Sequence, residues 1–478
     1  MIIDIDAVLY TQGFIKEDEL FRRMFTANAL IFAYREKFKS SPAKGVDRIN
    51  GFQYSTRSEK ELELVSEKCL NETFRFSPFL EKLKLKGRDK APRIIGIPTI
   101  RDRVVLHQLH RFLALVFPKT VQRNVASTYV RSVAEEMIDL EGSDTWICCT
   151  DIEKFYDSIQ HDRLIKLLKK QINCKIAISL IAHALHTPTV PQNARRINYS
   201  AFKQEKGVPQ GLAISNILAA IYMVDVDTHM RSISGLTYYR YVDDVLMYGN
   251  PKVVESAYES VRRRLSRRGL TLHGRTSPKT YVGPIDRRFS YLGYDFKLPN
   301  ITVRDETFER FLRAIAAKVS DFKHNYAKRL EKHKYLNQER LVDIFFLELN
   351  EKITGAISGN KRYGWMAYFN QITDEKLLHQ MDRAVASMIA RVPLLAAKGN
   401  PPLKTLARSH YELKFNPRGG YIRDYDLNIS VAQKLRFLDA RGRVDPDVPL
   451  TDAQIIERYE RYVKFVLAKM HADEGEIY

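Results

Sequence analysis

The chain has 478 residues, 45% of them hydrophobic and 28% charged, so it can bury several cores and is not a disordered polar tail. Its formal net charge is +20, with 77 Lys and Arg against 57 Asp and Glu, and a basic surface of this size favours nucleic acid as a partner. No apolar run approaches the ~18 residues of a membrane span, the four cysteines have no CxxC spacing, and the N-terminal segment lacks an export-signal pattern. We therefore expect a cytoplasmic protein with no membrane span and no structural zinc.

The first part of the chain predicts a mixture of helices and strands. Apolar spacing predicts helices over 15–40 and 58–72. Residues 93–100 read as a short strand, and 101–117 read as a helix that ends before a proline.

The middle of the chain contains a buried strand and a hairpin, each carrying acids. Residues 145–152 form an apolar run that ends in an acid, which is typical of a buried strand. Residues 236–249 predict a β-hairpin with two acids at its tip. The remaining predicted elements here are helices near 160–170, 211–230 and 251–268 and a strand pair over 288–298.

From about residue 305 the pattern becomes helical. A stretch rich in proline and glycine, 393–428, interrupts this part. The predicted helices are 306–333, 338–356, 363–369, 374–391 and 452–470. The coarse prediction is an α+β body followed by an all-α C-terminal lobe.

Three acids carry the candidate chemistry: Asp151 at a strand end, and Asp243 and Asp244 at the hairpin tip. Carboxylates gathered in one place repel one another, and Mg²⁺ prefers such oxygen ligands. Two Mg²⁺ ions ~4 Å apart can activate an attacking hydroxyl and stabilise a leaving phosphate. Paired aspartates alone are more typical of a solvated turn, so the neighbouring motifs decide between the two interpretations.

Those motifs resemble the motifs of reverse transcriptases over roughly 45–296, in the order in which the family has them. Tyr241-Val242-Asp243-Asp244 resembles the YxDD motif. The other similar segments are 93–99 with Asp102-Arg103, 151–159, 207–211 with Ser215-Asn216, Lys279-Thr280 and 291–294. The resemblance implies an RNA-directed DNA polymerase with a right-hand fold, in which fingers and a palm with an antiparallel sheet precede the helical lobe. We place the N-terminal and fingers region at 1–120, the palm with intercalated fingers elements at 121–300 and a thumb-like domain at 301–478.

The resemblance assigns catalysis to Asp151, Asp243 and Asp244. It implies that Asp151 and Asp243 bind two Mg²⁺ ions, or Mn²⁺, with Asp244 contributing less directly and the carbonyl of Ile152 completing one shell. The aromatic ring of Tyr156 would exclude a 2′-hydroxyl and so select dNTPs.

Further substrate contacts follow from the same resemblance. Arg93 and Lys86 would hold the triphosphate, although Lys84, Arg88 and Lys90 compete with Lys86 for that role. Gln210 would lie along the nucleotide and template, and Gly211 would let the backbone approach the substrate. Lys279 would lie near the leaving pyrophosphate. A surface lysine is an equally good interpretation of Lys279.

The segment around Lys361-Arg362-Tyr363-Gly364-Trp365 resembles the abortive-infection and unknown-group branch of bacterial enzymes. That branch implies antiphage defence, a structured noncoding RNA as template, a DNA product and, in some relatives, homo-oligomers. The alternatives are a group II intron-like or retron-like enzyme, and a nonenzymatic RNA-binding scaffold with a polymerase fold. A tyrosine near the terminus, Tyr459, Tyr462 or Tyr478, is a candidate protein primer.

Two further features are a basic stretch and a group of aromatic residues. The basic stretch 261–270 fits either a track for a phosphate backbone or the solvent face of a helix. The aromatic residues Trp365, Tyr368 and Phe369 are more typical of a helix-packing core than of a base-stacking platform.

Overall fold

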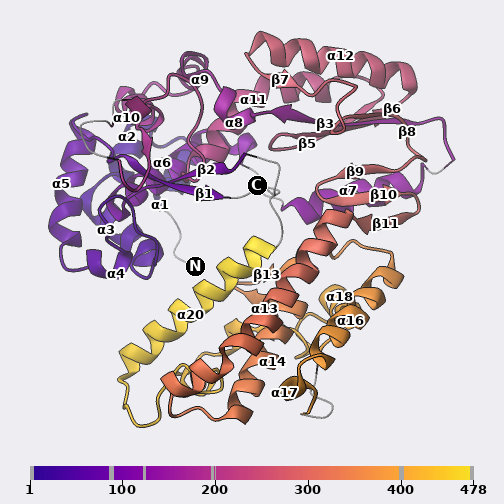
Figure 1. The fold of residues 1–478 in the computed structure, drawn as a ribbon. Helices are drawn as coiled ribbons and strands as arrows, with labels where there is room; N and C mark the ends of the chain where they lie inside the picture. Colours follow the sequence, from indigo (N-terminus) through magenta and orange to yellow (C-terminus); the bar gives the residue numbers. More distant parts are fainter. Residues whose placement is uncertain are drawn as a thin grey trace. The chain divides into compact units, whose positions relative to one another are not determined.

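The computed structural model describes residues 5–84, 91–121, 125–140, 142–194, 199, 201–397 and 403–473. Contacts divide the chain into two compact units (Figure 1). The first unit comprises Met1–Asn124 and Asp144–Gly283, and the second comprises Val125–Ser143 and Pro284–Tyr478. Among the described residues, no helix has the length and apolar character needed to cross a membrane. The division of the chain at 120 and 300 stays a prediction.

The N-terminal part of the first unit is a group of short helices. They are α1 (Ile5–Thr11), α2 (Glu17–Met24), α3 (Ala27–Ala33), the π-helix η1 (Tyr34–Phe38), α4 (Gly51–Tyr54) and α5 (Ser58–Leu70). The single helix predicted over 15–40 is therefore wrong. The Thr26 side chain accepts a hydrogen bond from the Ala29 amide and begins a new helix at that point.

A small sheet follows, built from β1 (Phe79–Lys84), β2 (Arg93–Ile97) and β4 (Thr189–Val190) in the order β2-β1-β4. Strands β1 and β2 are antiparallel, and β4 runs parallel to β1. Helix α6 (Ile100–Val116) begins directly after this sheet and buries most of its apolar face against the N-terminal helices.

The main sheet of the first unit has the strand order β5-β6-β3-β7. Its strands are β3 (Trp146–Glu153), β5 (Leu236–Tyr241), β6 (Asp244–Gly249) and β7 (Thr271–Leu272), and β8 (Tyr281–Pro284) also pairs with β3. The remaining helical segments are η2 (Pro118–Thr120), α8 (Phe155–Ser158), α9 (His161–Leu168), α10 (Lys175–His186), α11 (Ser215–Arg231) and α12 (Pro251–Arg267).

Helices α11 and α12 cover one face of the main sheet. Arg240 of β5 donates from Nε to Asp227 of α11 at 2.7 Å, and Arg240 is the register partner of Val245. Arg240 and Val245 therefore face the helices. Successive side chains of a strand alternate between faces, so Asp244, directly before Val245, points to the opposite face of the sheet.

The second unit is mostly helical. Its helices are α7 (Ala126–Ile138), α13 (Asp305–Lys332), α14 (Gln338–Thr354), α15 (Trp365–Tyr368), α16 (Glu375–Ala390), α17 (Pro393–Ala396), α18 (Leu406–Phe415), α19 (Val431–Asp439) and α20 (Asp452–Asp473), with a 3-10 turn η4 (Tyr425–Leu427). One sheet has the order β11-β10-β9, from β9 (Phe289–Tyr291), β10 (Tyr294–Lys297) and β11 (Asn300–Val303).

The prediction that the C-terminal lobe is all-α needs one correction. A second sheet, in the order β13-β12-β14, joins β12 (Ala356–Ser358), β13 (Lys361–Tyr363) and β14 (Arg423–Asp424). These strands have two or three residues each, too few for a period-2 pattern to be visible in the sequence. The proline- and glycine-rich stretch also contains a regular helix, α18.

The aromatic residues near 365 belong to the core, as predicted. Trp365 is 1% exposed and Phe369 is fully buried. The candidate primers Tyr459 and Tyr462 lie in a buried cluster with Phe437, and the Tyr459 hydroxyl donates to the carbonyl of Tyr425 at 2.9 Å. The Tyr459 hydroxyl is therefore engaged, and both rings are buried, which disfavours either residue as a primer; Tyr478 lies outside the described residues.

Candidate active site

The pairing of β3 with β6 brings the predicted acids together. Asp151 and Asp244 are direct partners in this antiparallel ladder. The Ile152 amide donates to the Asp243 carbonyl at 3.1 Å, so the hairpin tip is tied to the end of β3. Val242, in the turn before Asp243, has φ 57°, a left-handed conformation that is unusual for a β-branched residue. Backbone strain of this kind concentrates at functional sites.

The electrostatics of Asp243 show that the three carboxylates share one field. Burial, and then the negative charges of Asp244 and Asp151, raise the pKa of Asp243 to about 7. The positive charge of Arg93 opposes these effects on the pKa of Asp243. The acids and Arg93 therefore belong to one cluster, although Arg93 comes from the other sheet of the unit.

Asp151 has one occupied and one orphaned carboxylate oxygen. Oδ2 forms an ion pair with the ammonium of Lys279 and lies 3.8 Å from Nε2 of His273. Oδ1 is buried and has no hydrogen-bond partner in the described part of the chain. A buried anionic oxygen without a partner is costly, and such an atom is expected where a cation or a substrate binds.

The carboxylates of Asp151, Asp243 and Asp244 are ligands of the kind that Mg²⁺ prefers, but they form only part of a coordination shell. Within the described residues, no group of three or more His, Cys, Asp or Glu side chains is arranged to hold a metal ion. Mg²⁺ usually binds through only one or two carboxylates and completes its shell with water and substrate phosphates. The orphaned Asp151 oxygen beside Asp243 and Asp244 meets that lesser requirement. The metal roles of Asp151, Asp243, Asp244 and Ile152 stay predictions.

Tyr156 lies beside the acids. Its hydroxyl donates to Oδ1 of Asn216 at 2.8 Å, and its carbonyl accepts from the Val208 amide at 2.8 Å. Burial, and then the charge of Asp243, raise the pKa of the Tyr156 hydroxyl. The ring is therefore fixed between the segment after β3 and the turn before α11, close enough to Asp243 for their charges to interact.

The turn that carries Gln210 and Gly211 is fastened to β2. The Gly96 amide donates to the carbonyl of Gln210 at 2.7 Å. Gly211 has φ 100°, and a Cβ on it would lie 2.7 Å from Cγ2 of Ile95 and 2.8 Å from the carbonyl oxygen of Gly96. Only glycine fits this position without a shift of the backbone.

Arg93, at the start of β2, has an unsatisfied guanidinium nitrogen. Its Nε is buried and has no hydrogen-bond partner within the described residues. Arg93 also lowers the pKa of Asp243 and of the Tyr156 hydroxyl through its charge. A buried, unpaired donor beside the acids suits an anionic ligand such as a triphosphate. Lys86, the predicted second triphosphate contact, lies outside the described residues.

Sequence reasoning missed His273. It follows β7, its amide donates to the Asp151 carbonyl at 3.0 Å, and its Nδ1 lies 3.3 Å from Glu153. Nothing local to His273 marks it, because the contact depends on pairing between β7 and β3. Lys279 was predicted, but the structure places its ammonium on Asp151 itself.

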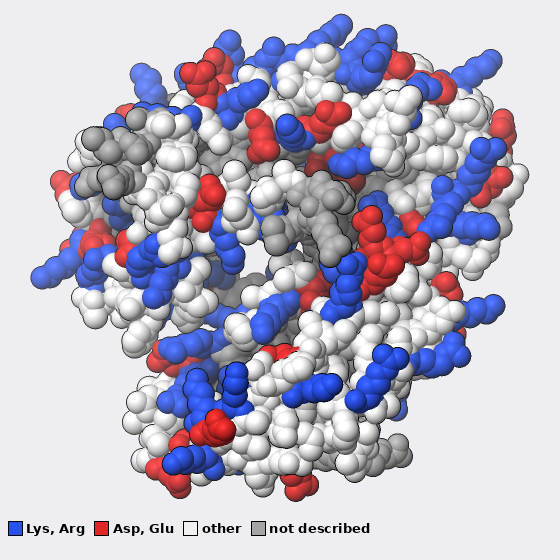
Figure 2. Space-filling model, viewed as in Figure 1, with Lys and Arg blue, Asp and Glu red and all other residues white. Residues whose placement is uncertain are grey.

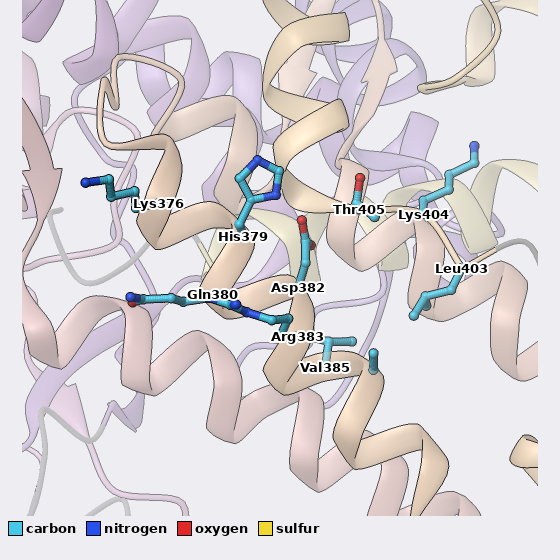
Figure 3. Close-up of a pocket in the computed structure, with 10 residues that line it drawn as sticks. Lys376, His379, Gln380, Asp382, Arg383, Val385, Leu403, Lys404 and Thr405 are labelled. Atoms are coloured by element: carbon cyan, nitrogen blue, oxygen red, sulfur yellow. The ribbon is translucent and has the colours of Figure 1, made fainter.

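A hollow of about 670 Å³ lies in the second unit, between α16 and the start of α18 (Figure 3). Lys376, His379 and Arg383 line it from α16. The one carboxylate among its lining residues is that of Asp382, which accepts from the Leu406 amide at 2.6 Å. This carboxylate binds the first amide of α18, and the described residues that line the hollow include no second acid that could form a catalytic pair.

Comparison with known proteins places the acids and their neighbours within a known domain. The family model described as "Reverse transcriptase (RNA-dependent DNA polymerase)" matches residues 84–296. This segment therefore matches a reverse transcriptase domain, and the predicted α+β polymerase fold is confirmed.

Relatives of known sequence match over a stretch of similar length. Protein YkfC of Escherichia coli K12 is 25% identical, over 41% of this chain and 53% of that protein. The group II intron-encoded protein LtrA of Lactococcus lactis subsp. cremoris is 24% identical, over 44% of this chain and 35% of that protein. The match therefore spans about half the length of these relatives or less. A solved telomerase from Candida albicans, in complex with a fragment of telomeric RNA, is 11% identical with a TM-score of 0.39, over 72% of this chain and 66% of that one.

Proposed function

We propose that the chain is an RNA-directed DNA polymerase that adds dNTPs to a primer by two-metal nucleotidyl transfer. The observation that carries this proposal is the β3–β6 register, which sets Asp151 directly opposite Asp244 beside Asp243. A reverse transcriptase domain over residues 84–296 supports the choice of reaction.

The side chains of this site have separable roles in the proposed reaction. Two Mg²⁺ ions held by Asp151 and Asp243 would lower the pKa of the primer 3′-hydroxyl and stabilise the leaving pyrophosphate. The unpaired Nε of Arg93 would bind the triphosphate, and the ring of Tyr156 would occupy the space that a 2′-hydroxyl needs. Lys279 neutralises Asp151 before substrate binds, and its ammonium would then be available to the leaving pyrophosphate.

The experiment is dNTP incorporation on a primed RNA template across a Mg²⁺ titration. We expect the double variant Asp243→Ala with Asp244→Ala to incorporate dNTPs at less than about one hundredth of the wild-type rate, because both metals lose ligands. Asp447→Asn, on an exposed loop of the second unit, is the control and should keep the wild-type rate. Wild-type-level synthesis by the double variant would overturn the proposal. RNA binding without any metal-dependent incorporation would favour the nonenzymatic scaffold instead.

For the biological role we propose antiphage defence with a structured noncoding RNA as template. The support is the resemblance of the 361–365 segment to the abortive-infection branch. The match to LtrA favours the alternative, an enzyme that acts with an intron RNA. Sequencing the RNA that copurifies with the chain separates the two, since defence predicts a small structured RNA and the alternative predicts an intron lariat. A plaque assay with the wild type and the Asp243/Asp244 double variant tests protection directly.

A further inference from the structure

Two basic stripes lie beside helix α11 on the outer side of the first unit. Along α9 and just beyond it, Arg163, Lys166 and Lys170 recur every three or four residues, so they share one side of the helix. Arg264 and Arg267 share one side of α12 in the same way. Helix α11 contacts both α9 and α12. In the view of Figure 2, basic side chains gather along the upper rim, where Figure 1 shows α9 and α12.

The stripes line a hollow of about 400 Å³, here called the α9–α12 hollow. Its one acidic lining residue is Asp225 of α11. The cations that line it are Arg163, Lys166, Lys170, Arg264, Arg267 and Arg268. Six cations against one carboxylate give the hollow a strong positive potential, which concave surfaces focus further.

Part of this basic surface is fixed in place by hydrogen bonds. Arg268 donates to the Tyr222 carbonyl at 2.7 Å and to Asp225 at 2.8 Å. Arg163 donates to the backbone carbonyl of Arg267, which links the end of α12 to α9. The one acid of the hollow is therefore already engaged, and two of its cations are held by the protein itself.

The other four cations, Lys166, Lys170, Arg264 and Arg267, have no ion-pair partner among the residues that the structure describes. Like charges gathered in one hollow repel one another unless an anion neutralises them. Four unpaired cations spread over two helices suit several linked phosphates better than a single phosphate ion. The hollow also exposes no large apolar side chain that could enter a lipid surface, since Val226 is buried and Leu167 is half-buried.

The hollow is separate from the candidate active site. Helices α11 and α12 cover the face of the main sheet that carries Val245, whereas Asp151 and Asp244 leave the opposite face. A strand bound in the hollow is therefore not the template segment being copied at the carboxylates.

We propose that the α9–α12 hollow binds the phosphodiester backbone of RNA and holds a part of the template molecule that is not being copied. The choice of RNA rests on the proposed function, in which RNA is the substrate of this chain. Contacts of this kind read phosphates and not bases, so they fix the position of the RNA without selecting its sequence.

The test is the affinity of the full chain for a fluorescently labelled RNA hairpin, measured at several salt concentrations without dNTPs. The triple variant Lys166→Gln, Lys170→Gln, Arg267→Gln removes three unpaired charges from the hollow. We expect binding about tenfold weaker or more, and a salt dependence whose slope falls by about 2, since each phosphate contact contributes roughly 0.7–0.9. The control triple Lys37→Gln, Lys60→Gln, Lys68→Gln removes three exposed charges from the N-terminal helices and should change affinity less than twofold.

Equal effects of the two triple variants would overturn the proposal. A second arm measures binding of inorganic tripolyphosphate by calorimetry. If the hollow triple loses tripolyphosphate binding but keeps the wild-type RNA affinity and salt slope, the hollow is a small-anion site and the RNA proposal is wrong. Binding is measured separately from synthesis, so a wild type that binds RNA through the hollow but incorporates no dNTP would refute the polymerase function and the role of this RNA as template, while RNA binding by the hollow would stand.

Discussion

Asp151 of β3 and Asp244 of β6 are direct partners across an antiparallel ladder, so two carboxylates leave the sheet side by side on one face. Like charges directly opposite each other destabilise a sheet. The ammonium of Lys279 offsets part of this repulsion, and one oxygen of Asp151 remains buried without a partner. The arrangement is unfavourable for folding alone and suits a site that receives cations.

The metal-free protein should lose stability as pH rises toward 7. The pKa of Asp243 is raised to about 7 from its ordinary value of 3.8, so its contribution to stability is fully present below pH ~4 and is lost as pH rises through about 7. Asp243→Asn lacks this dependence. We expect its melting temperature in EDTA to exceed that of the wild type by a margin that grows between pH 5 and 7.5, to roughly 2–4 °C.

Mg²⁺ should remove the difference in melting temperature between Asp243→Asn and the wild type, because a bound cation removes the penalty of charging Asp243. Thermal melting across pH, with EDTA and with Mg²⁺, measures both effects. A margin that is constant with pH would contradict the shifted titration of Asp243, and a margin that Mg²⁺ leaves unchanged would contradict its role as a ligand.

Gly211→Ala should both destabilise the first unit and lower dNTP incorporation. The new Cβ would meet Ile95 and the Gly96 carbonyl at under 3 Å, at a φ of 100° that alanine rarely adopts. The turn that carries Gln210 must then move away from β2, at a cost of about 1–3 kcal/mol. Urea unfolding and steady-state incorporation give the two measurements. The control is Gly274→Ala, whose Cβ would meet nothing within 4 Å and which should stay within ~0.5 kcal/mol of the wild type.

Tyr156→Val should relax the selection of dNTPs over rNTPs. The ring is held between Asn216 and the Val208 amide, beside Asp243, and removing it opens space for a 2′-hydroxyl. We expect the ratio of kcat/KM for dNTP over rNTP to fall by on the order of 10–200-fold, the range that small steric changes in a pocket produce. Tyr156→Phe keeps the ring and loses only the hydrogen bond to Asn216, so it should retain selectivity. A loss of selectivity in the phenylalanine variant would assign the effect to that hydrogen bond.

Local signals in the sequence predict the elements that carry the three acids, and the resemblance to reverse transcriptases predicts that these acids meet. The apolar run that ends at Asp151 predicts a buried strand with an acid at its end, and the β-rich arms around Asp243 and Asp244 predict a hairpin tip. The structure confirms both elements and the adjacency of the three acids. Their catalytic and metal roles come from the resemblance and stay predictions.

The contacts that the sequence could not predict are those set by long-range pairing. His273 and Lys279 reach Asp151 only because β7 pairs with β3, more than 100 residues earlier in the chain. The break at Thr26 depends on one side chain competing for a backbone amide within an otherwise helical pattern. Helix α18 lies in a stretch whose proline and glycine content predicts irregular structure. It is fixed instead by its N-cap Thr405 and by a second capping residue, Asp382 of α16.

That capping residue, Asp382, gives a last prediction about the second unit. Its carboxylate accepts from the amides of Leu406 at 2.6 Å and Ala407 at 3.2 Å, the first residues of α18. Asp382→Ala leaves both amides without this acceptor and should cost about 1–3 kcal/mol of stability. Burial raises the pKa of Asp382, so the negative charge of this carboxylate is not what stabilises the start of α18. Asp382→Asn should therefore lower stability by less than half as much as Asp382→Ala. Hydrogen exchange at residues 406–409 measures the effect where it arises: protection should fall strongly in the alanine variant and little in the asparagine variant. Equal loss in both would mean that the charge, and not the acceptor oxygen, holds the start of α18.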